Sequence, residues 1–311
     1  MHRGRVTDVR RTDAVLLLVA VVWGSSYLSA QTATFALPVL TVLFARYALS
    51  ALACLGLVAA RRGPRRWTRD ELRAGLALGV TQAAVLVVET YGVAHTSAAN
   101  AGLIISLTIV LTPLLDRSRG TLPAAYFAAA GVCVLAVGLL MSGNGFHSPR
   151  LGDLLMLAAA VIRAGHVALV GKLIGGRDVR PLHLTTVQAL LGACLFLPGA
   201  ATGLPELSRA GAATWTQLVY LALFCSVFAF LAQTWAVQRT SASRASLLLG
   251  TEPVWAVAAG ITLGGERYGL LTAVGAALLV AGTYWGQSVE RADRRRRVES
   301  RDLRLASPVG G

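Results

Sequence analysis

Residues 89–103 have the sequence ETYGVAHTSAANAGL, and residues 233–247 have the sequence QTWAVQRTSASRASL. The two stretches align without a gap at a shift of 144 residues. The matching positions are Thr90 with Thr234, Tyr91 with Trp235, Val93 with Val237, Thr96–Ala98 with Thr240–Ala242, Ala101 with Ala245, and Leu103 with Leu247. At the same shift, Gly131 falls on Gly275 and Gly138 on Gly282. Self-similarity at a fixed shift indicates an internal repeat that covers each half of the chain.

Long apolar runs surround both stretches. Mean hydropathy is +0.62 and only 14% of residues are charged, against roughly 25% in soluble domains. A helix that spans a bilayer needs about 20 mostly apolar residues. Ten segments meet this requirement: 14–34, 38–60, 72–93, 96–115, 123–142, 153–174, 183–201, 214–237, 243–263 and 268–287. The sequence therefore predicts an all-α polytopic membrane protein, whose first run is too long to be a cleavable signal peptide.

Each repeat contains five predicted helices, in residues 13–145 and 150–288. Because five is odd, the second repeat enters the membrane from the opposite side. The repeats are then inverted, an architecture typical of secondary transporters with a binding site near the bilayer midplane. Residues 1–12 and the basic residues 289–311 are predicted to be cytoplasmic tails.

The distribution of Lys and Arg tests this topology. If the N-terminus is inside, 24 of the 29 basic residues lie inside, three lie outside, and Arg46 and Arg163 lie within the membrane. Cytoplasmic loops of membrane proteins carry such an excess, so both termini are predicted to be cytoplasmic. The net charge of +14 suits anionic lipids at the cytoplasmic face better than nucleic acid, because the sequence has no soluble basic domain.

The four cysteines lie inside apolar runs without metal-ligand spacing, so neither a metal nor another cofactor is expected. No phosphate-binding loop, HExxH or GxSxG motif occurs, which argues against an enzyme. An intramembrane lipid-modifying enzyme, a channel and a small-molecule sensor remain alternatives to a transporter.

Several motifs resemble the EamA-like branch of the drug/metabolite transporter superfamily, over about residues 13 to 288. They are Val22–Ser26, Arg46, Tyr91–Ala98, Gly152-Asp153, Ser241-Ala242 through Glu252-Pro253, Gly264–Glu266, Gly275 and Gly282. The resemblance implies ten helices, two EamA repeats and solute transport across the cytoplasmic membrane, often outward. The chain departs from the pattern at Ile109, which stands where the second repeat has Pro253, and at Arg163, where an aromatic residue is frequent.

Charged groups near mid-bilayer are costly unless paired or hydrated, so each is a functional candidate. Arg163, His166 and Glu252 are predicted to lie at similar depth in the second repeat. Arg163 suits a substrate carboxylate and Glu252 a coupling proton, and His166 titrates in a useful range. A structural Arg163–Glu252 pair and a packing role for His166 are the alternatives.

Arg46 and Glu89 form a second candidate group, either an outer gate or a structural ion pair. Trp23, Tyr27, Tyr91 and Trp235 could line the pathway, although interfacial positions near helix ends also explain the last three. Glu266 is predicted to lie in an outer loop with a structural role.

The sequence thus predicts a proton-driven exporter of a small metabolite or drug, with an amino-acid-like or carboxylate-bearing substrate among the candidates. Arg is used almost to the exclusion of Lys, which suggests a GC-rich bacterial genome. The protein is therefore expected in the cytoplasmic membrane of a bacterium. A monomer and a homodimer are both compatible with the sequence.

Overall fold

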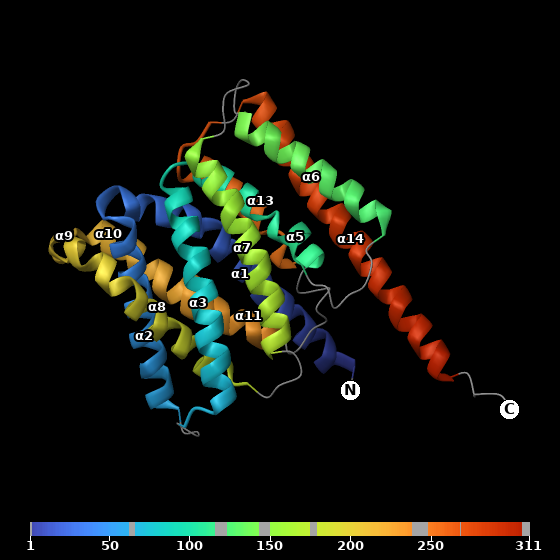
Figure 1. Cartoon of the computed structure of the whole chain (residues 1–311), viewed down its shortest axis with the longest axis horizontal. Coiled ribbons are helices and arrows are strands. Elements are labelled where there is room, and N and C mark those ends of the chain that lie inside the picture. The colour runs from blue at the N-terminus through green and yellow to red at the C-terminus, as the bar shows by residue number, and fades with distance from the viewer. Residues whose placement is uncertain are drawn as a thin grey trace.

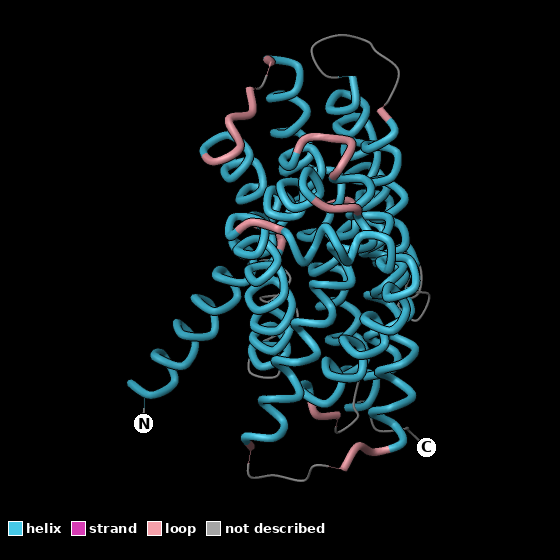
Figure 2. Tube along the Cα trace, turned by 90° about the vertical axis from the view of Figure 1, so that its left-hand side faces the viewer, coloured by secondary structure: helices cyan, strands magenta, loops and turns pink. Residues whose placement is uncertain are grey.

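The computed structural model describes residues 2–61, 66–115, 123–142, 150–174, 179–237, 248–267 and 269–306. These residues form helices joined by short loops, with no strand among them (Figure 2). The helices are α1 (His2–Ala36), α2 (Val39–Ala60), α3 (Arg69–Val93), α4 (Ala98–Ile105), α5 (Thr108–Leu115), α6 (Ala124–Ser142), α7 (Leu151–Ile174), α8 (Pro181–Ala200), η2 (Ala201–Gly203), α9 (Leu204–Arg209), α10 (Ala212–Val219), η3 (Tyr220–Phe228), α11 (Ala229–Val237), α13 (Glu252–Thr262) and α14 (Leu270–Ala306).

Every predicted segment contains at least one of these helices. Eight helical stretches are long and apolar enough to cross a membrane. The helix at Ala124–Leu139 is apolar but shorter, and α13 has 11 residues, with residues 238–247 before it outside the described part. The chain is therefore a multi-pass helical protein, while ten spans remain a prediction. Helix α14 also continues through the predicted basic tail to Ala306 and extends beyond its neighbour α6 (Figure 1).

Two predicted segments are not continuous α-helices. Segment 96–115 is interrupted between α4 and α5, where the amides of Ser106 and Leu107 donate to carbonyls three residues earlier. The Ser106 hydroxyl also donates to the Leu103 carbonyl at 2.6 Å, a local bond that competes with the helix. Segment 214–237 contains η3, a nine-residue π-helix between α10 and α11. Such interruptions are frequent at functional sites of helical proteins.

The packing pairs the two halves with each other. In the order of the predicted segments, α2 packs on α8, α4 on α13, and α6 on α14, each an element with its counterpart. Figure 1 shows α6 and α14 side by side. The other large contacts come in matched pairs. The contact of α3 with α7 corresponds to that of α1 with α10–α11. The contact of α3 with α8 corresponds to that of α2 with η3, and the contact of α1 with α13 corresponds to that of α4–α5 with α7. Exchanging the halves leaves this set of contacts unchanged.

Close approach between the halves depends on glycines at specific places. A Cβ on Gly192 of α8 would overlap the ring of Tyr47 on α2. A Cβ on Gly102 of α4 would likewise overlap Ala256 of α13. Small residues allow helices to approach closely where no hydrophobic driving force acts between them.

The α2–α8 contact gives a test of this packing. Gly192→Ala should destabilise the protein by about 1–2 kcal/mol, because the added methyl group overlaps the buried Tyr47 ring, as overpacking does elsewhere. Gly56→Ala on α2 is the matched control, since its Cβ meets no atom within 4 Å. Thermal unfolding of the purified variants in detergent measures both, and equal melting temperatures would contradict the packing.

Candidate functional site

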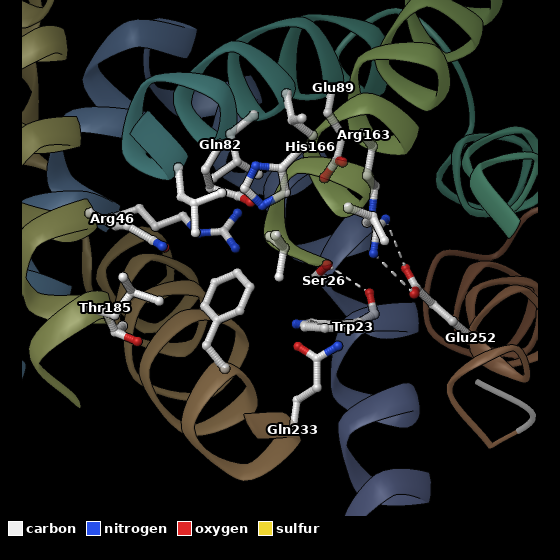
Figure 3. A pocket seen from close by; sticks show the side chains of 18 of the residues that line it. Trp23, Ser26, Arg46, Gln82, Glu89, Arg163, His166, Thr185, Gln233 and Glu252 are labelled. Carbon is white, nitrogen blue, oxygen red and sulfur yellow. Dashed lines mark hydrogen bonds and ion pairs between the residues drawn. The ribbon is translucent and has the colours of Figure 1, made fainter. Parts of the chain in front are cut away.

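A cavity of about 210 Å³ lies at the centre of the helical bundle (Figure 3). Helices of both halves contribute side chains to its wall. They are Trp23, Ser26 and Tyr27 of α1, Arg46 of α2, Leu78, Gln82, Val85, Leu86 and Glu89 of α3, Arg163, His166, Val167, Val170 and Ile174 of α7, Leu184, Thr185 and Gln188 of α8, Phe230 and Gln233 of α11, and Glu252 of α13.

Arg163 and Glu252 form the ion pair that was one of the two sequence-based alternatives. Nη2 of Arg163 lies 3.4 Å from Oε2 of Glu252, and the Tyr27 hydroxyl donates a hydrogen bond to Oε1 of the same carboxylate. The Arg163 guanidinium also lies over the ring of Trp23, 5.7 Å from its centroid. The pair therefore belongs to α7 and α13 but is fixed to α1 by two aromatic side chains.

The local sequence places the Glu252 carboxylate at a helix N-terminus. Glu252 is the first residue of α13 and Pro253 the second, a position where proline is tolerated because its missing amide would have no helical partner. The positive end of a helix dipole stabilises a carboxylate at this position.

His166 lies one turn after Arg163 on α7 and also lines the cavity. Its Nδ1 is 2.7 Å from Oγ1 of Thr81, so the ring is hydrogen-bonded to α3. The contact is compatible with both the packing role and the functional role expected from the sequence.

Arg46 and Glu89 reach the same cavity, but no ion pair joins these two described residues. Nε of Arg46 donates to Oγ of Ser226 at 2.9 Å. Ser226 lies in the π-helix η3, and its hydroxyl donates on to the Leu221 carbonyl. The carboxylate of Glu89 accepts no hydrogen bond from the described residues.

Of the four aromatic candidates, Trp23 lies in the cavity wall and its Nε1 donates to the Cys225 carbonyl at 3.1 Å. Tyr91 and Trp235 are not among the lining residues, and 38% and 37% of their surfaces are exposed. Tyr27, which the sequence placed near a helix end, is instead 2% exposed and hydrogen-bonded to Glu252.

At the predicted outer end, polar contacts join the halves; we call them the outer latch. Oγ1 of Thr96 donates to Oδ1 of Asp153 at 2.5 Å. The carboxylate of Glu266 accepts from the amides of Ala98 and Ala99 at 2.7 and 3.3 Å, and so caps the N-terminus of α4. Glu266 thus has a structural contact rather than the solvent contact usual for a loop charge.

At the predicted cytoplasmic end, a second group joins the halves; we call it the inner latch. Glu71 of α3 is 1% exposed and closes a capping box with Thr68. Its carboxylate accepts from Nε and Nη2 of Arg180 at 2.7 and 2.8 Å and lies 3.4 Å from Nδ1 of His183. Sequence reasoning missed this latch, although Thr68-x-x-Glu71 is a recognisable capping box.

Sequence reasoning also missed the neutral polar lining, which comprises Gln82, Thr185, Gln188 and Gln233. Neutral amides and hydroxyls are common in membrane helices and give no charge signal. Within the described residues no group of three or more His, Cys, Asp or Glu side chains could hold a metal. The wall offers two guanidinium groups, two carboxylates and several amides, a set suited to a small polar molecule that carries charge.

The ion pair gives a stability test. Arg163→Met should destabilise the protein by about 3 kcal/mol, at the lower end of the range for breaking buried pairs, because Arg163 keeps some exposure to the cavity and Tyr27 still binds Glu252. Arg209→Met, at an exposed arginine of α9, is the control and should change stability by less than about 0.5 kcal/mol. Similar unfolding curves in detergent for both variants would contradict a stabilising role of the pair.

Comparison with known proteins identifies the family of this chain. The model of the EamA-like transporter family matches residues 10–143 and 150–285. An uncharacterized transporter of Archaeoglobus fulgidus is 22% identical over 280 residues, which cover 88% of this chain and 96% of that protein. The uncharacterized transporter YetK of Bacillus subtilis is 26% identical over 205 residues, 62% of this chain and 61% of YetK.

A solved structure, titled only as the crystal structure of a protein, has the same fold. Its TM-score is 0.59 at 16% sequence identity, over 89% of this chain and 98% of that one. The family model matches one EamA unit in each half, and together the two units span most of the residues from the first predicted helix to the last. The chain therefore belongs to the EamA-like transporter family of the drug/metabolite transporter superfamily.

Proposed function

We propose that the protein is a secondary transporter that exports a small metabolite across the cytoplasmic membrane in exchange for protons. The observation that carries the proposal is the central cavity, whose charged wall is built by both halves of the chain. Polar latches join the halves at each end of the bundle. Opening one latch while the other stays closed would expose the cavity to one side at a time, as alternating access requires.

The matched contacts between the halves support the inverted-repeat architecture. Contacts that remain unchanged when the halves are exchanged are expected for two structurally equivalent units. In an inverted repeat, exchanging the conformations of the two units converts an inward-open state into an outward-open one. Two equivalent units would give inward-open and outward-open states of similar energy, so the exchange between them would not need ATP.

The cavity volume and charges favour a small polar substrate over a drug-sized one. The volume of about 210 Å³ is below the roughly 300–1,000 Å³ of pockets for drug-sized ligands. A substrate carboxylate could bind Arg46, whose guanidinium makes a single hydrogen bond among the described residues, through Nε. Arg163 is a second candidate if its bond to Glu252 opens. Planar guanidinium groups suit carboxylates well.

A monomer and a homodimer are both compatible with the proposed transport cycle. The helical extension of α14 carries the basic tail, which we propose contacts anionic lipids at the cytoplasmic face. The family match and the transporter relatives favour transport over a lipid-modifying enzyme, a channel or a sensor.

Transport by reconstituted protein tests the proposal. Labelled amino acids, organic acids and cationic drugs are offered to proteoliposomes with and without an acidic lumen. A one-unit pH difference should support up to about tenfold accumulation of one class in the acidic lumen, because each proton leaving it can drive one substrate inward. Arg163→Ala and Glu252→Gln should each reduce this accumulation, because each breaks the ion pair in the cavity wall.

Flux that is saturable and shows counterflow would separate a carrier from a channel. Arg209→Ala, far from the cavity, is the control for protein quality. No transport of any class, or flux indifferent to the gradient and to both cavity substitutions, would contradict the proposed mechanism and site.

A further inference from the structure

The cavity contains two carboxylates with very different surroundings. Glu252 accepts hydrogen bonds from Tyr27 and Arg163 and forms an ion pair with the latter. Glu89 lines the same cavity, and none of the described residues donates a hydrogen bond to its side chain or pairs with it. A carboxylate held within a membrane without a partner is costly when ionised, so it tends to take a proton or a cationic partner from outside.

The formal charges around Glu89 balance, although Glu89 forms no hydrogen bond or ion pair with any described residue. The titratable and charged groups that face it come from four helices: Tyr27 of α1, Arg46 and Tyr47 of α2, Arg163 and His166 of α7, and Glu252 of α13. Arg46 and Arg163 are offset by Glu89 and Glu252, so the cavity has no formal net charge when both acids are ionised. Figure 3 shows Glu89 and Arg163 reaching the cavity from neighbouring helices.

Glu89 also lies at the predicted outer end of the cavity. It is four residues before the end of α3 at Val93, about 6 Å along the helix axis. The chain continues from there to Thr96 of the outer latch. At the other end, the cavity wall reaches Ile174, the last residue of α7, near the predicted cytoplasmic side. When the outer latch opens, Glu89 is therefore the cavity carboxylate nearest the outside.

The internal repeat adds an independent observation. Glu89 and Gln233 occupy corresponding positions at the shift of 144 residues, and both line the cavity. Gln has the shape and neutral charge of a protonated Glu. The wall thus tolerates the neutral form at one of the two equivalent positions and has an ionisable group at the other.

We infer that Glu89 carries the coupling proton, and that the proton leaves when the amino group of a zwitterionic substrate takes its place. The substrate carboxylate would then lie toward Arg46, whose terminal guanidinium nitrogens donate to none of the described residues. Because proton and ammonium compete for one carboxylate, each replaces the other, and the result is exchange. This inference rests on the proposed transport function, and it gives Glu89 the role that the sequence suggested for Glu252.

Infrared titration of the full-length protein in lipid nanodiscs tests the proton site without a substrate. Between about pH 8 and 6, where solvent-exposed carboxylates stay ionised, the carbonyl band of a protonated carboxyl group should grow as the pH falls, be absent in Glu89→Gln, and persist in Glu252→Gln. Glu89→Asp should keep the band with a shifted midpoint, which guards against a folding defect of the Gln variant. A band that persists in Glu89→Gln, or that disappears in Glu252→Gln instead, would overturn the assignment.

Transport then separates this inference from the proposed function. Wild-type proteoliposomes with an acidic lumen should accumulate a labelled amino acid up to about tenfold per pH unit, but not the matching organic acid without its amino group. Glu89→Gln should lose the accumulation, because it can hold neither the proton nor the substrate ammonium, and the exposed control Glu206→Gln should behave as wild type.

The failures differ in kind. Wild type that moves no member of the panel contradicts the proposed transport. Wild type that transports, together with Glu89→Gln that still responds to the gradient, contradicts the role of Glu89 alone. Accumulation in an alkaline lumen would contradict exchange, because it requires proton and substrate to move together.

Discussion

A charge inside a bilayer must be paired or hydrated, and this constraint organises the centre of the protein. The Arg163–Glu252 pair satisfies it, and two aromatic residues of α1 fix the pair, Tyr27 through its hydroxyl and Trp23 through its ring. Helix α13 begins at Glu252, so the same carboxylate also compensates a helix N-terminus. The helices around the cavity are therefore positioned by a polar centre rather than by apolar packing alone.

At the ends of the bundle, too, charged side chains are paired, in the two latches that join the halves. Glu266 caps α4 and Asp153 binds Thr96 at one end, while Glu71 binds Arg180 at the other. Each contact joins one half of the chain to the other, and each consists of hydrogen bonds that water can replace when an end opens. These contacts can open one end at a time, whereas the apolar helix pairs α2–α8 and α6–α14 can stay packed as units.

The sequence predicted what depends on periodicity and charge. Apolar runs located the long helices but not the short α9, which lies between two predicted segments. The cost of membrane charge singled out Arg163, Glu252, Arg46 and Glu89, all of which reach the cavity. The sequence could not predict the partner of Arg46, which binds Ser226 of the π-helix η3 rather than Glu89. The amino-acid composition of that segment gives no sign of its irregular backbone hydrogen bonding. Neutral lining residues such as Gln188 gave no signal, and Tyr91 and Trp235 lie outside the cavity wall although the repeat motif contains them.

The central claim is that the halves open the cavity alternately to the two sides. Distances between spin labels test it, in a background without the four native cysteines. One pair, His95→Cys with Arg267→Cys, reports the predicted outer end, and a second, Arg61→Cys with Lys172→Cys, reports the predicted cytoplasmic end; all four sites are exposed. Between neutral and acidic pH, the account predicts that one distance lengthens while the other shortens. Two distances that stay fixed, or that lengthen together, would contradict alternating access.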